Sequence, residues 1–378
     1  MRKYLKWSLF FTVCWWLLLL PKHHFLFSTI LEPFQGACYQ LICSVFGQMP
    51  FHEDSSGMYL LLFITPLLGL LFGLSCFIPR IKQFNFNPLD ATRVVATYFL
   101  ILVLWEYGWI KLTKMQFYLP EPNTVYTEFG QLSKDLAYWS VIGSSHSYVV
   151  FLGILEILAG ILVLVKRTRF FGLLLTAGIF LNVLMVNVSF DISVKLFAFT
   201  LLGMTTVLLF AYPNQWRYLF QLPVKPTSVK QKVETPIKRW GRALVLSLMV
   251  VEVVSPAILS ESLNDDTIPR PAYHGAYTIH HHPTLNQLFV HRRGYIIVEN
   301  KQGEQLSWKI MHETNGQFQL LEEVSGKRSI LRFYNSKKKL NVRWMQGSNT
   351  IQFEISPLPY KEIPLLKDSF HWFSDSYH

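Results

Sequence analysis

The stretch Tyr148–Val165 reads YVVFLGILEILAGILVLV and carries a single charged side chain, that of Glu156. A run of about 20 predominantly apolar residues crosses the hydrocarbon core of a bilayer as one α-helix. Six further runs of this kind are Tyr4–Leu20, Met58–Ile78, Val94–Leu112, Phe170–Phe190, Val194–Tyr212 and Ala243–Leu259. The sequence therefore predicts an all-α membrane bundle of about seven transmembrane helices.

The composition agrees with a membrane protein. Of the 378 residues, 51% are hydrophobic and only 16% are charged, whereas about 25% of the residues in a soluble domain are charged. Trp, Tyr and Phe make up 15% of the chain, which suits aromatic rings at membrane interfaces. The net charge is +11. We interpret this charge as a topology signal and not as a nucleic-acid surface, because it gathers in alternate loops.

The basic residues flank the apolar runs on one side only. They are Arg2, Lys3 and Lys6, then Arg80, Lys82 and Arg93, then Lys166, Arg167 and Arg169, and last Arg217, Lys225, Lys230, Lys232, Lys238, Arg239 and Arg242. The positive-inside rule then places the N-terminus in the cytoplasm and the C-terminal region outside it. The first run is expected to be a retained anchor, because Pro21–His24 follows it in place of a small-residue cleavage site.

The first external loop, Pro21–Gly57, is more than a linker. Its segments His24–Phe27 and Ala37–Cys43 are apolar but too short to span, so we expect interfacial or re-entrant helices here. The spacing of Cys38 and Cys43 fits neither a C-x-x-C redox motif nor a zinc pattern. A structural disulfide or two free thiols are therefore favoured over a redox-active pair.

The chain after the seventh run predicts a separate β domain. Within Tyr273–Trp372, Arg293–Glu299 is typical of a strand, Asn300–Gly303 of a turn and Gln305–Met311 of the returning strand. Repeated short strands with such turns favour a small extracytoplasmic antiparallel barrel or sandwich. Within this domain, His280–His282 together with His274 could suggest a metal, but no nearby Cys or carboxylate completes a site. No metal is predicted, and Lys337–Lys339 is interpreted as a solvated hairpin tip.

Five regions are therefore predicted. They are 1–90 with two spans and external loop helices, 91–212 with four spans, 213–242 as a basic cytoplasmic connector, 243–260 as the seventh span and 261–378 as the β-rich domain. In the second of them, an external insert from Met115 to Ser147 contains a helical stretch, Phe129–Ile142, and is expected to cover the outer mouth of the bundle.

Polar side chains inside the spans are the candidate site, because an ionised group at the midplane costs at least ~2.5–3.5 kcal/mol. Lys111, Asn187, Asp191 and Lys195 lie near outer helix ends, and Glu156 lies roughly 12 Å deeper along its helix at about 1.5 Å per residue. These groups could form an outward-facing polar cleft. The outer-end charges could instead extend to water, and Asn182 and Asn187 could join helices by hydrogen bonds.

The same region resembles a known family. Tyr107–Lys111 reads YGWIK, and Gln116, Phe117 and Pro120 follow, which resembles the YG-x-x-K…QF-x-x-P motif of DoxX-like membrane proteins. Further positions in the family's order are Trp139, Gly143–Ser145, Tyr148, Phe151, Gly153, Glu156, Gly160, Arg167–Arg169, Gly172, Asn182, Asn187, Asp191, Val194 and Lys195. The resemblance covers roughly Ala91–Leu209. Ile142 and Ser144 vary the family's usual Met-Gly-x-Ser turn.

The resemblance implies a four-helix core in spans three to six and a link to membrane redox chemistry, since some relatives are subunits of thiosulfate:quinone oxidoreductases. The layout is similar to a larger bacterial subgroup with extra N-terminal spans and a C-terminal β domain. The Phe370–Trp372 element resembles that subgroup's FHW end, although Phe373–His378 lacks its basic ending.

We therefore predict a subunit of an envelope redox system that binds a quinone or a small polar ligand noncovalently, and we leave open whether it is catalytic. Lys111 would hydrogen-bond a carbonyl, Glu156 would carry a proton, and Asp191 would hold the polar rim. The other expected ligand-lining residues are Tyr107, Gln116, Trp139, Ser145, Tyr148, Asn182, Asn187 and Lys195.

Two other functions fit parts of the sequence. In the alternative reading the protein is a non-enzymatic membrane scaffold or export component whose β domain docks an extracytoplasmic partner. A small-solute carrier is less favoured, because the polar cluster lies on one side and no inverted repeat is evident. All readings share the bilayer as a partner.

Overall fold

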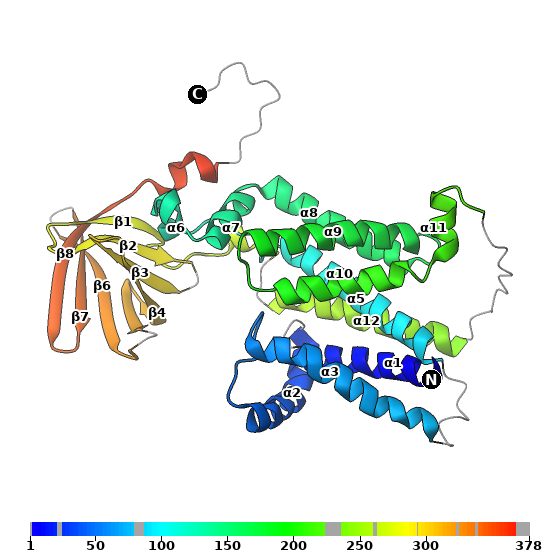
Figure 1. Cartoon of the computed structure of the whole chain (residues 1–378). Coiled ribbons are helices and arrows are strands. Elements are labelled where there is room, and N and C mark those ends of the chain that lie inside the picture. Colours follow the sequence, from blue (N-terminus) through cyan, green and yellow to red (C-terminus); the bar gives the residue numbers. More distant parts are fainter. Residues whose placement is uncertain are drawn as a thin grey trace, which may run out of the picture. The chain divides into compact units, whose positions relative to one another are not determined.

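The computed structural model describes residues 2–20, 25–78, 87–223, 236–259, 263–292, 294–322, 325–336 and 339–367. The chain divides into two compact units (Figure 1). The first contains residues 1–113 and 150–263, and the second contains residues 114–149 and 264–378. Several residues named above lie outside the described ranges: Pro21–His24, Arg80, Lys82, Lys225, Lys230, Lys232, Arg293, Lys337, Lys338 and Phe370–His378.

The first unit is helical. Its helices are α1 (Arg2–Leu19), α2 (Phe25–Phe46), α3 (Ser56–Gly73), α5 (Pro88–Leu112), most of α8 (His146–Leu164), α9 (Arg169–Ser189), α10 (Lys195–Leu209), α11 (Pro213–Leu219) and α12 (Pro236–Leu259), with a 3₁₀ turn η1 (Leu74–Phe77). Five of them, α3, α5, α8, α9 and α12, are long and apolar enough to cross a membrane. The protein is therefore a multi-pass membrane protein.

Among the described residues, fewer helices than the seven predicted are long and apolar enough to cross a membrane. The helices α10 and α11 qualify only as a pair, and the chain bends by 83° between them. Helix α1 carries Arg2, Lys3 and Lys6 within its 18 residues, which raises its charge above that of an ordinary span. The number of spans and the placement of each helix in the bilayer stay predictions.

The first external loop differs from its prediction. Instead of two short segments, a single 22-residue helix, α2, includes Pro33 in its interior. Gln35 donates to the carbonyl oxygens of Leu18 and Leu20 at 2.9 and 2.6 Å, and the hydroxyl of Tyr39 donates to Leu19 at 2.6 Å. The last carbonyls of a helix have no partner within that helix. Here α2 supplies their donors, which ties its middle to the end of α1.

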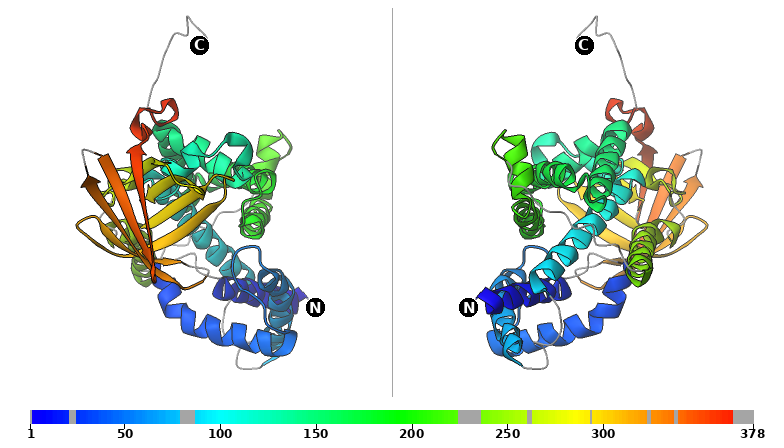
Figure 2. Two further views of the ribbon diagram at one scale, coloured as in Figure 1. Left: turned by 90° about the vertical axis from the view of Figure 1, so that its left-hand side faces the viewer. Right: turned by 90° about the vertical axis from the view of Figure 1, so that its right-hand side faces the viewer.

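The β domain of the second unit is confirmed and is a closed antiparallel barrel (Figure 2). Its strands are β1 (Gly275–His280), β2 (Leu285–His291), β3 (Tyr295–Asn300), β4 (Gln305–Thr314), β5 (Gln317–Glu322), β6 (Arg328–Ser336), β7 (Lys339–Gln346) and β8 (Asn349–Pro357). Each strand pairs with the next, and β1 pairs with β8. The predicted strand, turn and strand around Asn300–Gly303 correspond to β3 and β4.

Large apolar side chains fill the barrel. Alternate residues of a strand face opposite sides, and the inward set is buried on every strand. It includes Leu288, Val298, Trp308, Phe318, Phe333, Trp344 and Phe353. The rings of Trp308 and Trp344 meet edge to face with centroids 4.7 Å apart. The barrel interior is thus a packed core.

The insert between α5 and α8 belongs to the same compact unit as the barrel. It contains α6 (Pro122–Tyr126), a 3₁₀ turn η2 (Phe129–Gln131) and α7 (Lys134–Ser144). The helical stretch predicted over Phe129–Ile142 corresponds to η2 and α7.

Candidate functional site

Two predicted site residues, Lys111 of α5 and Glu156 of α8, form a buried ion pair. The ammonium nitrogen of Lys111 lies 2.9 and 3.1 Å from the two carboxylate oxygens of Glu156. Only 7% and 8% of the two side chains are exposed. The ammonium also donates to the carbonyl of Tyr107 at 3.4 Å and lies 5.4 Å from the centre of that tyrosine ring. Glu156, which has no basic neighbour on its own helix, is therefore neutralised by a different helix.

Glycines bring these two helices together. A Cβ atom on Gly108 would lie 2.8 Å from the carbonyl oxygen of Gly153, and a Cβ on Gly153 would lie 2.7 Å from that of Gly108. Small residues allow helices in membranes to approach closely. Lys111 and Glu156 each follow one of these glycines by three residues, so each lies on the same face as its glycine. The crossing of α5 and α8 therefore positions the ion pair.

Asp191 pairs with Lys195, whereas Lys111 pairs with Glu156. The ammonium of Lys195 lies 2.8 Å from the Asp191 carboxylate and 3.8 Å from that of Asp54. The Asp191 side chain is 84% exposed, as expected of a surface rim and not of an enclosed catalytic group. Its proposed role at the ligand stays a prediction.

Asp54, in the loop before α3, has a structural role that was not predicted from the sequence. Its carboxylate accepts the backbone N–H groups of Val194, Lys195 and Leu196 at 3.0, 2.8 and 2.8 Å. These are among the unpaired donors at the start of α10, where a negative charge also complements the helix dipole. Val194 has φ of 146°, which is an outlier for a β-branched residue. Asp54 holds this strained turn in place.

The remaining predicted ligand residues of the first unit differ in burial. Tyr107 packs near Phe197 with ring centroids 6.5 Å apart. Asn187 is 5% exposed, and its amide nitrogen has no acceptor among the residues that the structure describes. Asn182 is on the exposed surface of α9. The structure thus gives Asn187 an interior position and Asn182 an outer one.

Four predicted ligand residues belong to the second unit. Trp139 packs on Phe117 with ring centroids 4.5 Å apart. The hydroxyl of Ser145 accepts the backbone N–H of Tyr148 at 3.4 Å, which is a capping contact at the start of α8. The carbonyl oxygen of the Gln116 side chain is buried without a donor within the described ranges. Trp139 and Ser145 therefore have structural roles inside the insert.

A cluster of buried charges joins the insert to the barrel. Arg292, at the end of β2, lies with its Nε atom 2.9 Å from the Glu121 carboxylate and also pairs with Asp265. Only 3% of the Arg292 side chain and 5% of the Glu121 side chain are exposed. The guanidinium lies 3.6 Å from the centre of the Tyr118 ring. His274 contributes a nitrogen 3.3 Å from Glu121.

A second buried ion pair, between Lys114 of the insert and Asp266, also joins the insert to the chain that leads into the barrel. The fully buried ammonium of Lys114 lies 3.3 Å from Asp266 and donates to the carbonyl of Gly143 at 2.8 Å. Asp266 also accepts the backbone N–H of Leu119 at 2.9 Å. Buried charges are tolerated only when they are paired. The insert and the barrel therefore fold as one body, which the sequence did not indicate.

The surroundings of Glu121 set its protonation. Burial alone would raise the pKa of this carboxyl, but the hydrogen bond from His274, the charge of His291 and the backbone N–H of Arg292 together hold its pKa below the ordinary value. Glu121 is therefore the ionised partner of this cluster at neutral pH.

The histidine and cysteine candidates show ordinary local contacts. His280 lies 2.7 Å from the hydroxyl of Ser356, and a ring nitrogen of His282 accepts the N–H of Leu285 at 3.0 Å. Within the described part of the chain, no three His, Cys, Asp or Glu side chains are grouped as metal ligands. Cys38 and Cys43 are free thiols.

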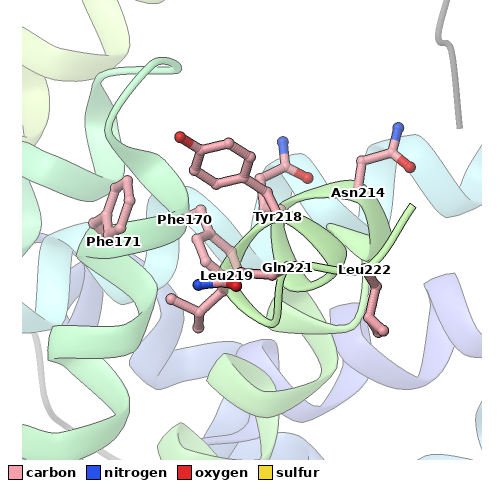
Figure 3. A pocket seen from close by; sticks show the side chains of 8 residues that line it. Phe170, Phe171, Asn214, Tyr218, Leu219, Gln221 and Leu222 are labelled. Atoms are coloured by element: carbon pink, nitrogen blue, oxygen red, sulfur yellow. The ribbon is translucent and has the colours of Figure 1, made fainter. Parts of the chain in front are cut away.

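A pocket of about 690 Å³ lies away from these residues, between the start of α9 and α11. Phe170 and Phe171 come from α9, and the other lining residues come from α11 and the turn after it (Figure 3). None of the residues predicted to bind a ligand lines this pocket.

Comparison with known proteins gives one short match. No family model matches the chain, and no solved structure matches it. The chain is 33% identical over 95 residues to the Bacillus subtilis protein described as "Uncharacterized protein YwoB". The match covers 25% of this chain and 62% of YwoB, so this chain spans less than two thirds of that relative's length.

Proposed function

We propose that this protein is a DoxX-like inner-membrane subunit whose barrel docks an acidic segment of a protein partner outside the cytoplasm. One observation carries the proposal. Arg332 of β6 and Arg343 of β7 are direct register partners, and both side chains are exposed. Like charges directly opposite one another destabilise a sheet. Such a pair is expected where a negatively charged partner offsets the repulsion.

Two further cations lie on neighbouring strands, close to this arginine pair in the register of the sheet. Lys309 and Arg328 are register partners of Leu321 from either side, and both are exposed. The nearby Glu354 is already paired with Lys339 at 2.7 Å. The basic face, defined as Lys309, Arg328, Arg332 and Arg343, therefore presents its cations to solvent across β4–β7.

The buried link between insert and barrel supports a docking role. Because Lys114–Val149 connects α5 to α8, the barrel is held by this connecting segment as well as by the chain that follows α12. A partner bound to the barrel is thereby tied to the membrane helices through two chain segments. This arrangement suits an assembly component.

A photo-crosslinker tests the docking proposal. We would place p-benzoylphenylalanine at Gln319, an exposed position on β5, in the full-length protein in native membranes. The expected result is one crosslinked protein whose acidic segment carries the crosslink. Its yield should fall with added salt and in Arg332→Glu, but not in Lys301→Glu, an exposed control in the turn between β3 and β4. Equal yields in both variants would contradict the proposal.

A ligand centre at Lys111 and Glu156 is a second candidate. The pair is buried between two helices that are each able to span a membrane, and ionisable groups in such helices usually mark function. A quinone carbonyl at Lys111 would have to displace one of the acceptors that its ammonium has now. The lysine ammonium has three donors, and Glu156 and Tyr107 accept them.

Loss of function in one variant would distinguish the candidates. In Glu156→Gln, quinone-coupled turnover of membranes should be lost if the ion pair is the functional centre, whereas crosslinking at Gln319 should persist. Unchanged turnover with normal expression would remove Glu156 from any redox role.

A further inference from the structure

The pocket between α9 and α11 has the chemistry of a lipid site. Phe170 and Phe171 of α9 line it together with residues of α11 and the following turn, among them the amides Asn214 and Gln221 (Figure 3). Its volume of about 690 Å³ is in the range of small-molecule sites. Apolar groups beside amide donors match the glycerol region of a phospholipid, where acyl chains meet a polar headgroup.

The pocket is built by a defined structural device. The 83° bend after α10 turns α11 across the direction of the preceding helix. Trp216 fixes α11 there, because its indole N–H donates to the carbonyl of Leu209 at 3.0 Å and its ring meets Phe170 edge to face at 5.3 Å. Tyr218 and Phe220 are left 77% and 64% exposed. Exposed aromatic rings on a helix lying across a bundle are typical of a membrane interface.

The charge at this end of the bundle selects an anion. Lys166 and Arg167 form the exposed turn just before α9. From Ile157 to Leu222 the only acidic residue is Asp191. It follows the opposite end of α9, and 21 residues at ~1.5 Å each place it about 30 Å away along the helix. The turn that precedes Phe170 and Phe171 is therefore cationic, and the acidic residue of this part of the sequence lies at the other end of α9.

We propose that this pocket binds one anionic phospholipid, with the acyl chains against Phe170 and Phe171 and the phosphodiester near Lys166 and Arg167. The positive-inside pattern of the sequence matches the cytoplasmic leaflet, whose anionic lipids attract cations at the membrane surface. The site is separate from the basic face of the barrel and from the Lys111–Glu156 pair.

Native mass spectrometry of the full-length protein tests the site. The protein would be released from nanodiscs that contain equal amounts of phosphatidylglycerol and phosphatidylcholine. The unmodified chain should retain one phosphatidylglycerol in preference to phosphatidylcholine. The double variant Lys166→Gln/Arg167→Gln should lower that preference more than about tenfold, since each surface cation contributes about fivefold.

Two matched controls make the result decisive. The double variant Lys238→Gln/Arg239→Gln removes the same charge from an exposed turn of α12 and should leave the preference unchanged. Phe171→Ala should reduce retention of the lipid, whereas Phe199→Ala, which is equally exposed on α10, should not. Equal losses in either matched pair would overturn the proposal, because the effect would then be general surface binding.

Discussion

Lys111 and Lys114 are three residues apart, and each is buried against a carboxylate of a different unit. Lys111 pairs with Glu156 in the helical unit at 2.9 Å, and Lys114 pairs with Asp266 in the barrel unit at 3.3 Å. One short segment at the end of α5 therefore carries a buried cation for each unit.

The Lys111–Glu156 pair gives the first prediction. In Glu156→Gln the lysine loses its counter-charge, and removing one partner of a buried ion pair costs about 3–5 kcal/mol. Thermal unfolding in detergent should show a clear drop in midpoint. The combination Lys111→Met/Glu156→Leu should recover much of that loss. Asp191→Asn, on an exposed carboxylate, should change stability by less than about 1 kcal/mol. A drop for Asp191→Asn as large as that for Glu156→Gln would contradict this reading.

The glycine crossing gives the second prediction. In Gly153→Ala the new Cβ would lie 2.7 Å from the carbonyl of Gly108, so the helices must separate and the ion pair must lengthen. We expect a loss of about 1–3 kcal/mol, the usual cost of overpacking. Gly178→Ala in α9, where nothing lies within 4 Å, should be neutral or stabilising by up to about 1 kcal/mol. Indistinguishable unfolding midpoints for the two variants would show that the close contact is not formed.

The capping of α10 gives the third prediction. Asp54→Ala removes the acceptor of three backbone N–H groups, and loss of an N-cap costs about 0.5–2 kcal/mol. Hydrogen exchange at Val194–Leu196 should accelerate. The adjacent Glu53→Ala, with an exposed side chain, is the matched control and should leave these amides protected. Faster exchange in both variants would point to the loop as a whole and not to the cap.

The pH dependence of the barrel unit gives the fourth prediction. The pKa of Glu121 is lowered in the folded state, so its stabilising contribution is present above the ordinary carboxyl value and is lost as pH falls through the lowered pKa. Near-ultraviolet circular dichroism should follow the loss. Glu121→Gln should weaken this acid dependence. Glu304→Gln, at an exposed carboxylate just before β4, should retain it, and an unchanged acid profile in Glu121→Gln would disprove the assignment.

The sequence indicates which residues matter in the helical unit better than it indicates their partners. Lys111 and Glu156 stand out because ionised groups are costly in apolar helices. Their pairing depends on how α5 and α8 cross, and that is set by Gly108 and Gly153 through a contact between distant segments. Sequence spacing describes neighbours on one helix and carries no information about a crossing.

The buried charges of the insert were missed for a related reason. Glu121 and Arg292 are far apart in the sequence, and each has the appearance of an ordinary loop charge until the barrel closes. Asp54 is similar, since its three donors belong to residues around Val194. In contrast, the turn before Gln305 was predictable because hairpin geometry is local. The sequence predicted a local feature such as this turn, but it did not predict contacts between residues that are far apart in the chain.

Closure of the barrel limits how a neighbour can attach to it. Because β1 pairs with β8, none of the eight described strands offers a continuous free edge to an incoming peptide strand. Recognition by strand addition needs such an edge, and an open edge is also a template for aggregation. Copies of this domain can therefore lie close together without pairing their strands into one continuous sheet.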